Sequence, residues 1–418
     1  MPPAHDTSSS PSPAAADAPG KIYRVGIIGA GNRARPHAAE YHRCGDVAVA
    51  AIADPVPAQR RRLIEAAGLS NSVAEYDDLQ AMLAAEQLDG VVITTPNHLH
   101  ADHAVPCLER GLPVLLEKPL ATTPEDCLRI VRAEQRTAGR MLLGFVLRST
   151  PFYAKIRDLL AGGAIGRVFA IQADEIPSLS VTSGMNRSPW RRYTGPSGGT
   201  MLEKCCHDMD IFNWLMESRP TALASFGGRR IILPDPSKPR HCRDCAEAES
   251  CLYHPRRVRP LATDEQLAQW RDAECIYNLE KDTKDLQSVC IEYETGGLVN
   301  FLLAMVCGGD KGQRNFAAQG TTGRLWGNSS EHTIHVYDYF TRETATHHLL
   351  VDRSGHGGGD RAHILLLRRM MQDPDYVPAQ GGTAGYLSAM MCFAADRSCD
   401  ERRRIAFEYD PSGEIRLR

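Results

Sequence analysis

The chain has 418 residues, enough for two or three domains with separate cores. Its 48 Lys and Arg residues against 51 Asp and Glu residues give a formal net charge of -3, and no basic run indicates a nucleic-acid partner. No apolar run approaches the roughly 20 residues that span a bilayer, so we expect no membrane partner either.

Residues 1–20 are rich in Pro, Ala and Ser and predict a disordered tail. They lack the positively charged start and the apolar core of a signal peptide. The 13 cysteines are spread through the chain, which favours reduced thiols. Together these features predict a cytoplasmic protein.

The first predicted ordered element is a strand at residues 22–28, followed directly by a glycine turn and a helical pattern. Gly29 permits the turn, Gly31 lets the backbone approach a pyrophosphate, and Ala34 allows close helix packing. Strand, glycine turn and helix in this order predict a dinucleotide-binding unit.

A second buried strand is predicted at residues 47–53 and ends at Asp54. A carboxylate at the tip of this strand accepts from both ribose hydroxyls of NAD and repels the 2′-phosphate of NADP. The alternative phosphate ligands are Arg60, Arg61 and Arg62, just beyond. Because a run of arginines on a helix is usually a solvated face, we expect NAD.

The alternation of strands and helices continues to about residue 145 and predicts an α/β unit with a doubly wound parallel sheet. Its further helices are predicted at 58–67 and 76–86, and its further strands at 88–93, 112–116 and 145–148. Beyond it, helices are predicted at 151–160 and 385–397, and strands at 168–174, 287–293, 298–303, 316–320 and 323–327.

Polar residues follow two of the parallel strands at their carboxyl ends, where ligands bind in such sheets. Thr95, Asn97 and His100 are candidates to contact the nicotinamide half of the cofactor, with a helix start capped by Asn97 as the alternative. Glu117 and Lys118 close the next strand. We expect these two to pair, and the alternative is an ordinary surface ion pair.

A further helix is predicted to begin after Gly198 and Gly199. On it, Glu203, His207 and Asp210 project from one face. An imidazole between two carboxylates would be an oriented proton acceptor of raised basicity. The alternative is a helix start whose acidic residues suit the dipole and whose histidine caps or packs.

The chain resembles the Gfo/Idh/MocA oxidoreductases from Lys21 to its end, because four motifs occur in their order and spacing: residues 29–33, 95–100, 117–119 and 203–210. The resemblance implies a Rossmann domain, here residues 21–145. It also implies a second α/β domain, here residues 146–418, with a large, open, mainly antiparallel sheet that often forms homodimer or homotetramer contacts.

The resemblance further implies that Lys118 and His207 are catalytic and meet at the nicotinamide, with Glu203 assisting the histidine. The family usually has aspartate at that acidic position and a glycine and an apolar residue where this chain has Cys205 and Cys206, so the acid here reaches farther. The predicted NAD ligands are Gly29, Gly31, Asn32, Arg33, Asp54, Thr95, Asn97, His100, Glu117 and Lys118.

The chemistry of alcohol oxidation suits these residues. The hydroxyl proton must be removed while hydride leaves the same carbon for the nicotinamide. His207 fits the role of the base, and the Lys118 ammonium would stabilise the developing alkoxide.

Two loops are predicted to bind the substrate. One places Trp190 among arginines, and an aromatic face with guanidiniums suits a sugar that carries an anionic group. The other is the glycine-rich segment 355–360, before a helix predicted at 364–371. The alternatives are a solvated loop and a flexible helix entry capped by Asp360. The predicted ligands are Arg148, Arg187, Trp190, Arg191, His356 and Asp360.

An insert at residues 234–285 carries Cys242, Cys245, Cys251 and Cys275 with the spacing C-x2-C-x5-C-x23-C. Four thiolates at such spacing can close a structural zinc site in a segment too polar to fold alone. His241 and His254 are alternative ligands, and four unliganded thiols are the other interpretation.

Three functions remain open from the sequence. The first is an NAD-dependent dehydrogenase that oxidises a secondary hydroxyl of a sugar, polyol or glycoside. The second is a redox glycoside hydrolase, in which oxidation, elimination, water addition and re-reduction leave no net NADH, and which needs an additional base such as His356 or Asp360. The third is an inactive NAD-binding regulator.

Overall fold

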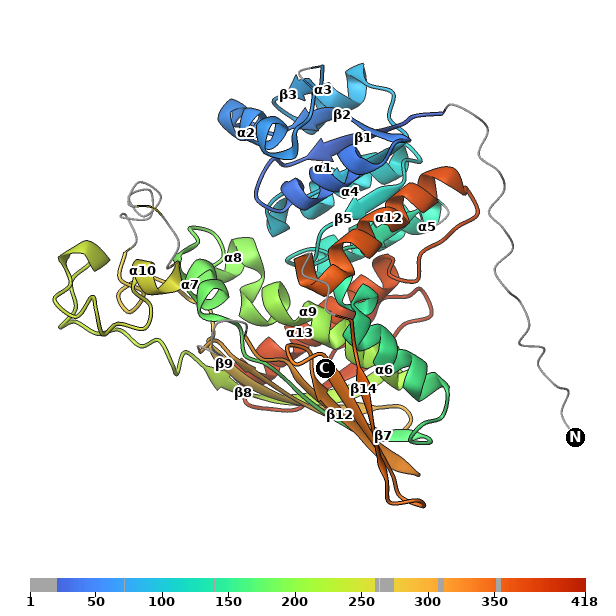
Figure 1. Cartoon of the computed structure of the whole chain (residues 1–418), viewed down its shortest axis with the longest axis vertical. Helices are drawn as coiled ribbons and strands as arrows, with labels where there is room; N and C mark the ends of the chain where they lie inside the picture. Colours follow the sequence, from blue (N-terminus) through green and yellow to red (C-terminus); the bar gives the residue numbers. More distant parts are fainter. Residues whose placement is uncertain are drawn as a thin grey trace, which may run out of the picture.

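The computed structural model describes residues 21–70, 72–137, 140–259, 263, 274–306, 312–350 and 355–418. The predicted tail at residues 1–20 lies outside them. Figure 1 shows the first sheet, in blue, above a broad second sheet, with helices α9 and α13 between them. Within the described residues, no helix combines the length and the apolar character that crossing a bilayer requires.

The first sheet has six parallel strands in the order β3-β2-β1-β4-β5-β6, the order of a Rossmann fold. Its strands are β1 Tyr23–Ile28, β2 Val47–Ala53, β3 Ala74–Tyr76, β4 Gly90–Ile93, β5 Val114–Leu116 and β6 Met141–Leu143. Its helices are α1 Ala34–Arg43, α2 Pro57–Ala67, α3 Leu79–Ala85, α4 His100–Glu109 and α5 Pro124–Arg136, with a 3-10 turn η1 at Asn97–Leu99. Apolar residues fill the central strands because helices cover both sheet faces.

Two predicted elements of this unit are corrected. The strand expected at residues 145–148 is a 3-10 turn, η2 Val146–Ser149, and the last strand is β6. The chain leaves the sheet there because the Phe145 amide donates to the Leu143 carbonyl at 2.6 Å. The helix expected at 76–86 begins only at Leu79, where the Asp78 carboxylate caps it by accepting from the Ala81 amide.

The second sheet has ten strands in the order β14-β13-β12-β11-β7-β10-β9-β8-β15-β16. They are β7 Val168–Glu175, β8 Pro220–Gly228, β9 Leu286–Tyr293, β10 Leu298–Ala304, β11 Asn315–Gly320, β12 Gly323–Asn328, β13 Thr333–Asp338, β14 Thr344–His348, β15 Ile405–Tyr409 and β16 Ile415–Leu417. Only the pairing of β7 with β10 is parallel among those described, so the sheet is mainly antiparallel as expected.

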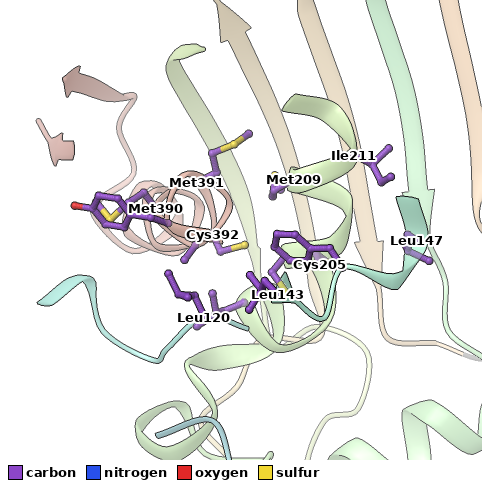
Figure 2. Packing of buried hydrophobic residues seen from close by; sticks show 14 of the residues in the cluster. Leu120, Leu143, Leu147, Cys205, Met209, Ile211, Met390, Met391 and Cys392 are labelled. Carbon is purple, nitrogen blue, oxygen red and sulfur yellow. The ribbon is translucent and has the colours of Figure 1, made fainter. Parts of the chain in front are cut away.

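Helices cover one face of this sheet (Figure 1). Along β9 and β10 buried residues alternate with exposed ones, which lie on the other face. The helices of this unit are α6 Pro151–Ala161, α7 Leu179–Arg187, α8 Thr194–Ser197, α9 Gly199–Met216, α10 Pro255–Val258, α12 Gly359–Gln372 and α13 Gly382–Glu401, with 3-10 turns η3 Cys242–Asp244 and η4 Gly355–Gly358. Figure 2 shows α9 beside α13, with Cys205 and Met209 on α9 and Cys392 on the facing side of α13.

Helix α12 returns to the first sheet. Its buried side chains Ile364, Leu367 and Met370 belong to the same apolar cluster as residues of β1 and β2. Arg368 pairs with Asp46 at 2.6 Å on the same flank. The C-terminal part of the chain therefore completes the core of the N-terminal sheet.

Candidate active site

The site lies where the carboxyl ends of the first-sheet strands face the start of α9. Lys118 follows β5, and its Nζ donates to the Glu203 carbonyl oxygen at 2.5 Å and lies 3.5 Å from the Glu203 carboxylate. A residue at a strand tip and a helix far away in the sequence are thus joined at one point.

The Glu203 carboxylate is buried and surrounded by donors. It accepts from Asn97 Nδ2 at 2.5 Å and lies 3.1 Å from Arg191 Nε. These contacts, with Lys118, commit both of its oxygens. The Glu203 side chain therefore reaches the lysine and the asparagine, and within the described part of the chain its carboxylate pairs with Asn97, Lys118 and Arg191 rather than with His207.

His207 is buried beside the ring of Phe145, with ring centroids 5.9 Å apart. Its Nδ1 has no hydrogen-bond partner among the described residues. Burial lowers the pKa of His207 well below its usual value, and the positive charge of Lys118 lowers it further. The predicted rise in basicity is therefore wrong, because burial and the surrounding positive charges disfavour the protonated ring. The imidazole is held neutral.

The second carboxylate of the predicted pair, Asp210, is bound by Arg148. The guanidinium donates to it through Nε at 2.7 Å and Nη2 at 2.5 Å, and it also lies over the Trp214 ring. Arg148 is therefore a brace for α9, which corrects its assignment as a substrate ligand.

A buried ion network fixes the opposite side of α9. Arg314 lies 2.6 Å from Glu175 and 3.1 Å from Asp208, and Lys204 lies 2.8 Å from Glu175. Burial raises the pKa of Asp208 against the effect of Arg314. Sequence reasoning missed this network, because Arg314 lies far from α9 along the chain and no motif marks it.

The glycine turn fits a dinucleotide. Gly29 has a φ of +90°, and a Cβ there would lie 2.9 Å from the Thr95 amide nitrogen, so glycine is required. A Cβ on Gly31 would meet nothing within 4 Å, so the space that a pyrophosphate needs is open. Asp54 at the tip of β2 accepts from the Ala30 and Val56 amides at 2.8 and 2.9 Å. Its carboxylate is thereby fixed at the tip of β2, next to the glycine turn.

Arg60, one alternative phosphate ligand, is already paired. Its guanidinium lies 3.0 Å from Glu75 and 2.8 Å from Asp77, and it also donates to the Asp54 carbonyl. Arg61 and Arg62 are exposed, as expected for a solvated face.

Arg33, next to the glycine turn, joins the two halves of the chain. It lies 2.6 Å from Glu117 and 2.7 Å from Asp360, which in turn lies 3.0 Å from His356 Nδ1. Glu117 also lies 2.9 Å from His37. Burial alone would raise the pKa of Glu117, but Arg33 and His37 lower it. The expected pairing of Glu117 with Lys118 is therefore wrong.

His100 is a brace. It is fully buried, with Nδ1 2.7 Å from the Pro119 carbonyl oxygen and Nε2 3.1 Å from that of Thr95. Its ring nitrogens are thus both occupied, which corrects its assignment as a cofactor ligand. The Thr95 hydroxyl lies 3.0 Å from His103 Nδ1, and Asn97 donates to Glu203 and to the Ser197 carbonyl.

Two arginines that precede α9, Arg187 and Arg191, contact different parts of the protein. Arg187 donates to the Tyr253 and Glu274 carbonyls at 3.0 and 3.3 Å and so points into the insert, which corrects its assignment as a substrate ligand. Arg191 instead contacts Glu203 and lies 4.9 Å over the Trp190 ring. Arg191 is thus the residue of this loop that contacts Glu203, and the Trp190 ring lies against its guanidinium.

The cysteines of the insert do not form the expected metal site. Within the described part of the chain, no three His, Cys, Asp or Glu side chains are placed to hold a metal ion. The Cys242 thiol instead accepts from Arg187 at 3.5 Å. The insert packs around apolar residues, which are Leu179, Ile232, Tyr253, Val258, Ile276 and Leu279. Cys245 and Cys251 are half-buried, and Cys275 is buried.

Comparison with known proteins identifies both halves. Residues 23–145 match the model of an oxidoreductase family with an NAD-binding Rossmann fold, and residues 153–326 match the GFO/IDH/MocA C-terminal domain. The putative oxidoreductase YteT of Bacillus subtilis is 27% identical over 79% of this chain and 84% of its own length. Inositol 2-dehydrogenase 4 of Saccharopolyspora erythraea is 32% identical over 56% of this chain and 62% of its own length, less than two thirds.

Solved structures share the fold. A levoglucosan dehydrogenase in complex with NADH superimposes with a TM-score of 0.73 at 18% identity, covering 92% of this chain and 99% of that one. An aldose-aldose oxidoreductase from Caulobacter crescentus, complexed with glycerol, gives a TM-score of 0.67 at 17% identity over 92% and 100%.

Proposed function

The chain belongs to the Gfo/Idh/MocA family of NAD-dependent oxidoreductases, and on that premise we propose that it oxidises a secondary hydroxyl of a sugar, polyol or glycoside. The observation that carries the proposal is the contact of Lys118 Nζ with the Glu203 carbonyl at 2.5 Å. This contact brings an ammonium to the helix that bears His207, one turn further on.

His207 is the proposed base. Because its pKa is lowered, the ring is neutral at physiological pH and has a lone pair to accept the hydroxyl proton. Lys118 hydrogen-bonds the same oxygen and stabilises the charge that develops on it. Glu203, with Asn97, positions Lys118. NAD bound at the glycine turn and Asp54 supplies the hydride acceptor.

Trp190 and Arg191 are proposed to bind the substrate. An aromatic face packs against the apolar side of a sugar ring, and a guanidinium donates to hydroxyls or to a carboxylate. Names of relatives support a polyol or sugar, since they include inositol 2-dehydrogenases and a levoglucosan dehydrogenase.

A redox glycoside hydrolase is the second candidate. His356 is half-exposed on η4, and its charge contributes to the low pKa of His207, so it lies within electrostatic range of the site. Such a group could take the second proton that elimination requires. Asp360 is less suited, because it is paired with both Arg33 and His356.

Self-association through the second sheet is also proposed. Leu298 and Leu302 on β10 are 44% and 37% exposed on the uncovered face. A cavity of about 410 Å³ lies on that face, lined in part by Asp174, Leu302 and Trp326. A second copy of the chain would cover these groups and form a homodimer or homotetramer.

A substrate panel tests the proposed function. The purified protein is incubated with NAD and myo-inositol, levoglucosan, D-glucose, D-xylose or p-nitrophenyl glycosides, while NADH and nitrophenol are measured. Stoichiometric NADH supports the dehydrogenase, and nitrophenol without NADH supports the hydrolase. Neither product, with NAD bound, would contradict both and favour the inactive regulator.

A further inference from the structure

The loop at residues 188–193, which we call the recognition loop, bears Trp190 and Arg191. It reaches the catalytic groups through Arg191, which lies 3.1 Å from Glu203, the residue that contacts Lys118. The side chain of Arg191 is nevertheless 42% exposed, so its own surroundings do not fix the loop. The insert supplies further contacts, at both ends of the loop and at Arg192 within it.

Both ends of the recognition loop are bound by one segment of the insert, residues 281–285, which we call the strap. Before the loop, Asn186 accepts from Lys281 Nζ at 2.7 Å. After the loop, the Thr194 amide and hydroxyl both donate to the Asp282 carboxylate, at 2.7 and 3.0 Å. The Asp282 amide also donates to the Arg192 carbonyl at 3.3 Å.

The strap is itself rigidly held. The side chain of Lys281 is fully buried, 3.7 Å from the Asp285 carboxylate. That carboxylate accepts from the three successive amides of Arg230, Ile231 and Ile232. Beyond Asp285 the chain enters β9 directly. A buried carboxylate that accepts from three successive amides is fixed in one position, because leaving these donors without a partner is costly.

The strap is also joined to the catalytic helix. The Thr200 hydroxyl in the first turn of α9 donates to the Lys284 carbonyl at 2.6 Å. A second brace comes from Glu274 of the insert, which lies 3.1 Å from Arg192. The recognition loop and the start of α9 are therefore set against the same segment.

We infer that the insert determines substrate recognition: the strap, through Asp282, holds Arg191 and the adjacent Trp190 beside Glu203, the residue that contacts Lys118. Asp282 is then a positioning residue for the sugar or polyol, acting through the recognition loop. This inference rests on the proposed function for its substrate, but not for the placement of the loop. The charged hydrogen bonds from Thr194 are the part that a single substitution can remove.

The test compares Asp282→Ala with Asp282→Asn, which keeps an acceptor oxygen. The matched control is Glu247→Ala, which removes an exposed insert carboxylate that pairs with Lys238 at 2.5 Å. For the panel compound with the highest kcat/KM, we expect Asp282→Ala to raise KM about tenfold while kcat and the Kd for NAD change less than threefold. Asp282→Asn should recover most of the loss, and the control should match the wild type.

Hydrogen exchange of the same proteins without substrate tests the placement directly. Peptides that cover residues 186–198 should exchange faster in Asp282→Ala than in the wild type and in the control, with the rest of α9 unchanged. An unchanged KM, or a KM rise without faster exchange of this segment, would overturn the inference.

Failure of the proposed function can be distinguished from failure of the inference about the strap. If the wild type oxidises no panel compound, that function fails, and the exchange result alone decides whether the strap holds the loop. If Asp282→Ala does not fold, Thr194→Val removes only the hydroxyl bond and should raise KM by a smaller factor. An unchanged KM in that variant overturns the inference.

Discussion

Lys118 and His207 act on the same oxygen in the proposed mechanism, although each is held by different neighbours. Lys118 is directed by Glu203, whereas His207 is enclosed beside Phe145. The resemblance to the family implies that these two residues meet at the nicotinamide, and this stays a prediction. It did not anticipate that Glu203 would serve the lysine, because the length of an acidic side chain decides its partner only in three dimensions.

Replacing Lys118 by Met or His207 by Asn should lower kcat about a thousandfold, because each removes a group that acts on the reacting oxygen. The Kd for NAD should change less than threefold, since the glycine turn and Asp54 bind the cofactor. Steady-state kinetics and NADH fluorescence titration measure the two. Loss of NAD affinity in parallel with kcat would contradict the assigned roles.

The pKa of His207 has consequences in acid. The pKa of His207 is lowered in the folded protein, so the unfolded chain binds the proton more readily. Burial of the neutral ring is therefore fully tolerated above pH 6.5, and the folded state loses stability as the pH falls below that value. The acid limb of kcat/KM should therefore lie below pH 6.5. NMR titration of labelled histidine should find the low pKa, raised in Lys118→Met. A wild-type value at or above 6.5 would refute this account.

Strands β1, β2, β4 and β5 of the first sheet could be predicted because their apolar runs and the glycine turn are local signals, whereas the three-residue strands β3 and β6 were missed. The turn at residues 146–149 could not, because Val146 and Leu147 are as apolar as strand residues and are buried by η2 packing instead. The organisation of the insert could not be predicted from local signals either. Its cysteines suggested a metal, whereas a small apolar cluster gathered from distant positions organises it.

Cofactor choice belongs to the β2–α2 connection. Asp54→Ala should weaken NAD binding about tenfold, because ribose contacts are lost, and should narrow the preference over NADP. It should not create strong NADP binding, since Arg60 is held by Glu75 and Asp77. Kd values for both cofactors measure this, with exposed Arg61→Ala as the control. Tight NADP binding by the wild type would contradict it.

At the scale of the whole molecule, the site forms from pieces that no local pattern connects. Arg314 with Asp208, Arg148 with Asp210 and Arg33 with Asp360 each join distant parts of the chain. Sequence spacing placed the acidic residues on α9 but not their partners. The sequence therefore predicted the helix correctly but predicted the wrong direction for the pKa shift of His207.

The uncovered sheet face makes a prediction about assembly. Leu302→Lys, in the centre of that face, should shift the protein toward the monomer, because burying an ammonium against a second copy is costly. Light scattering after size exclusion measures the mass. Val377→Lys, exposed at another site, is the control and should leave the mass unchanged. A wild-type monomer would contradict the proposed association.

The return of α12 to the first sheet matters for biosynthesis. Strands β1 to β6 are synthesised early. Ile364, Leu367 and Met370 pack against one side of these strands, but they are translated after most strands of the ten-stranded sheet. Until then the nascent Rossmann unit has an unsealed apolar side. The core of the Rossmann unit is therefore completed only late in translation or after it. Until then, chaperones that shield nascent chains have a defined apolar surface to bind.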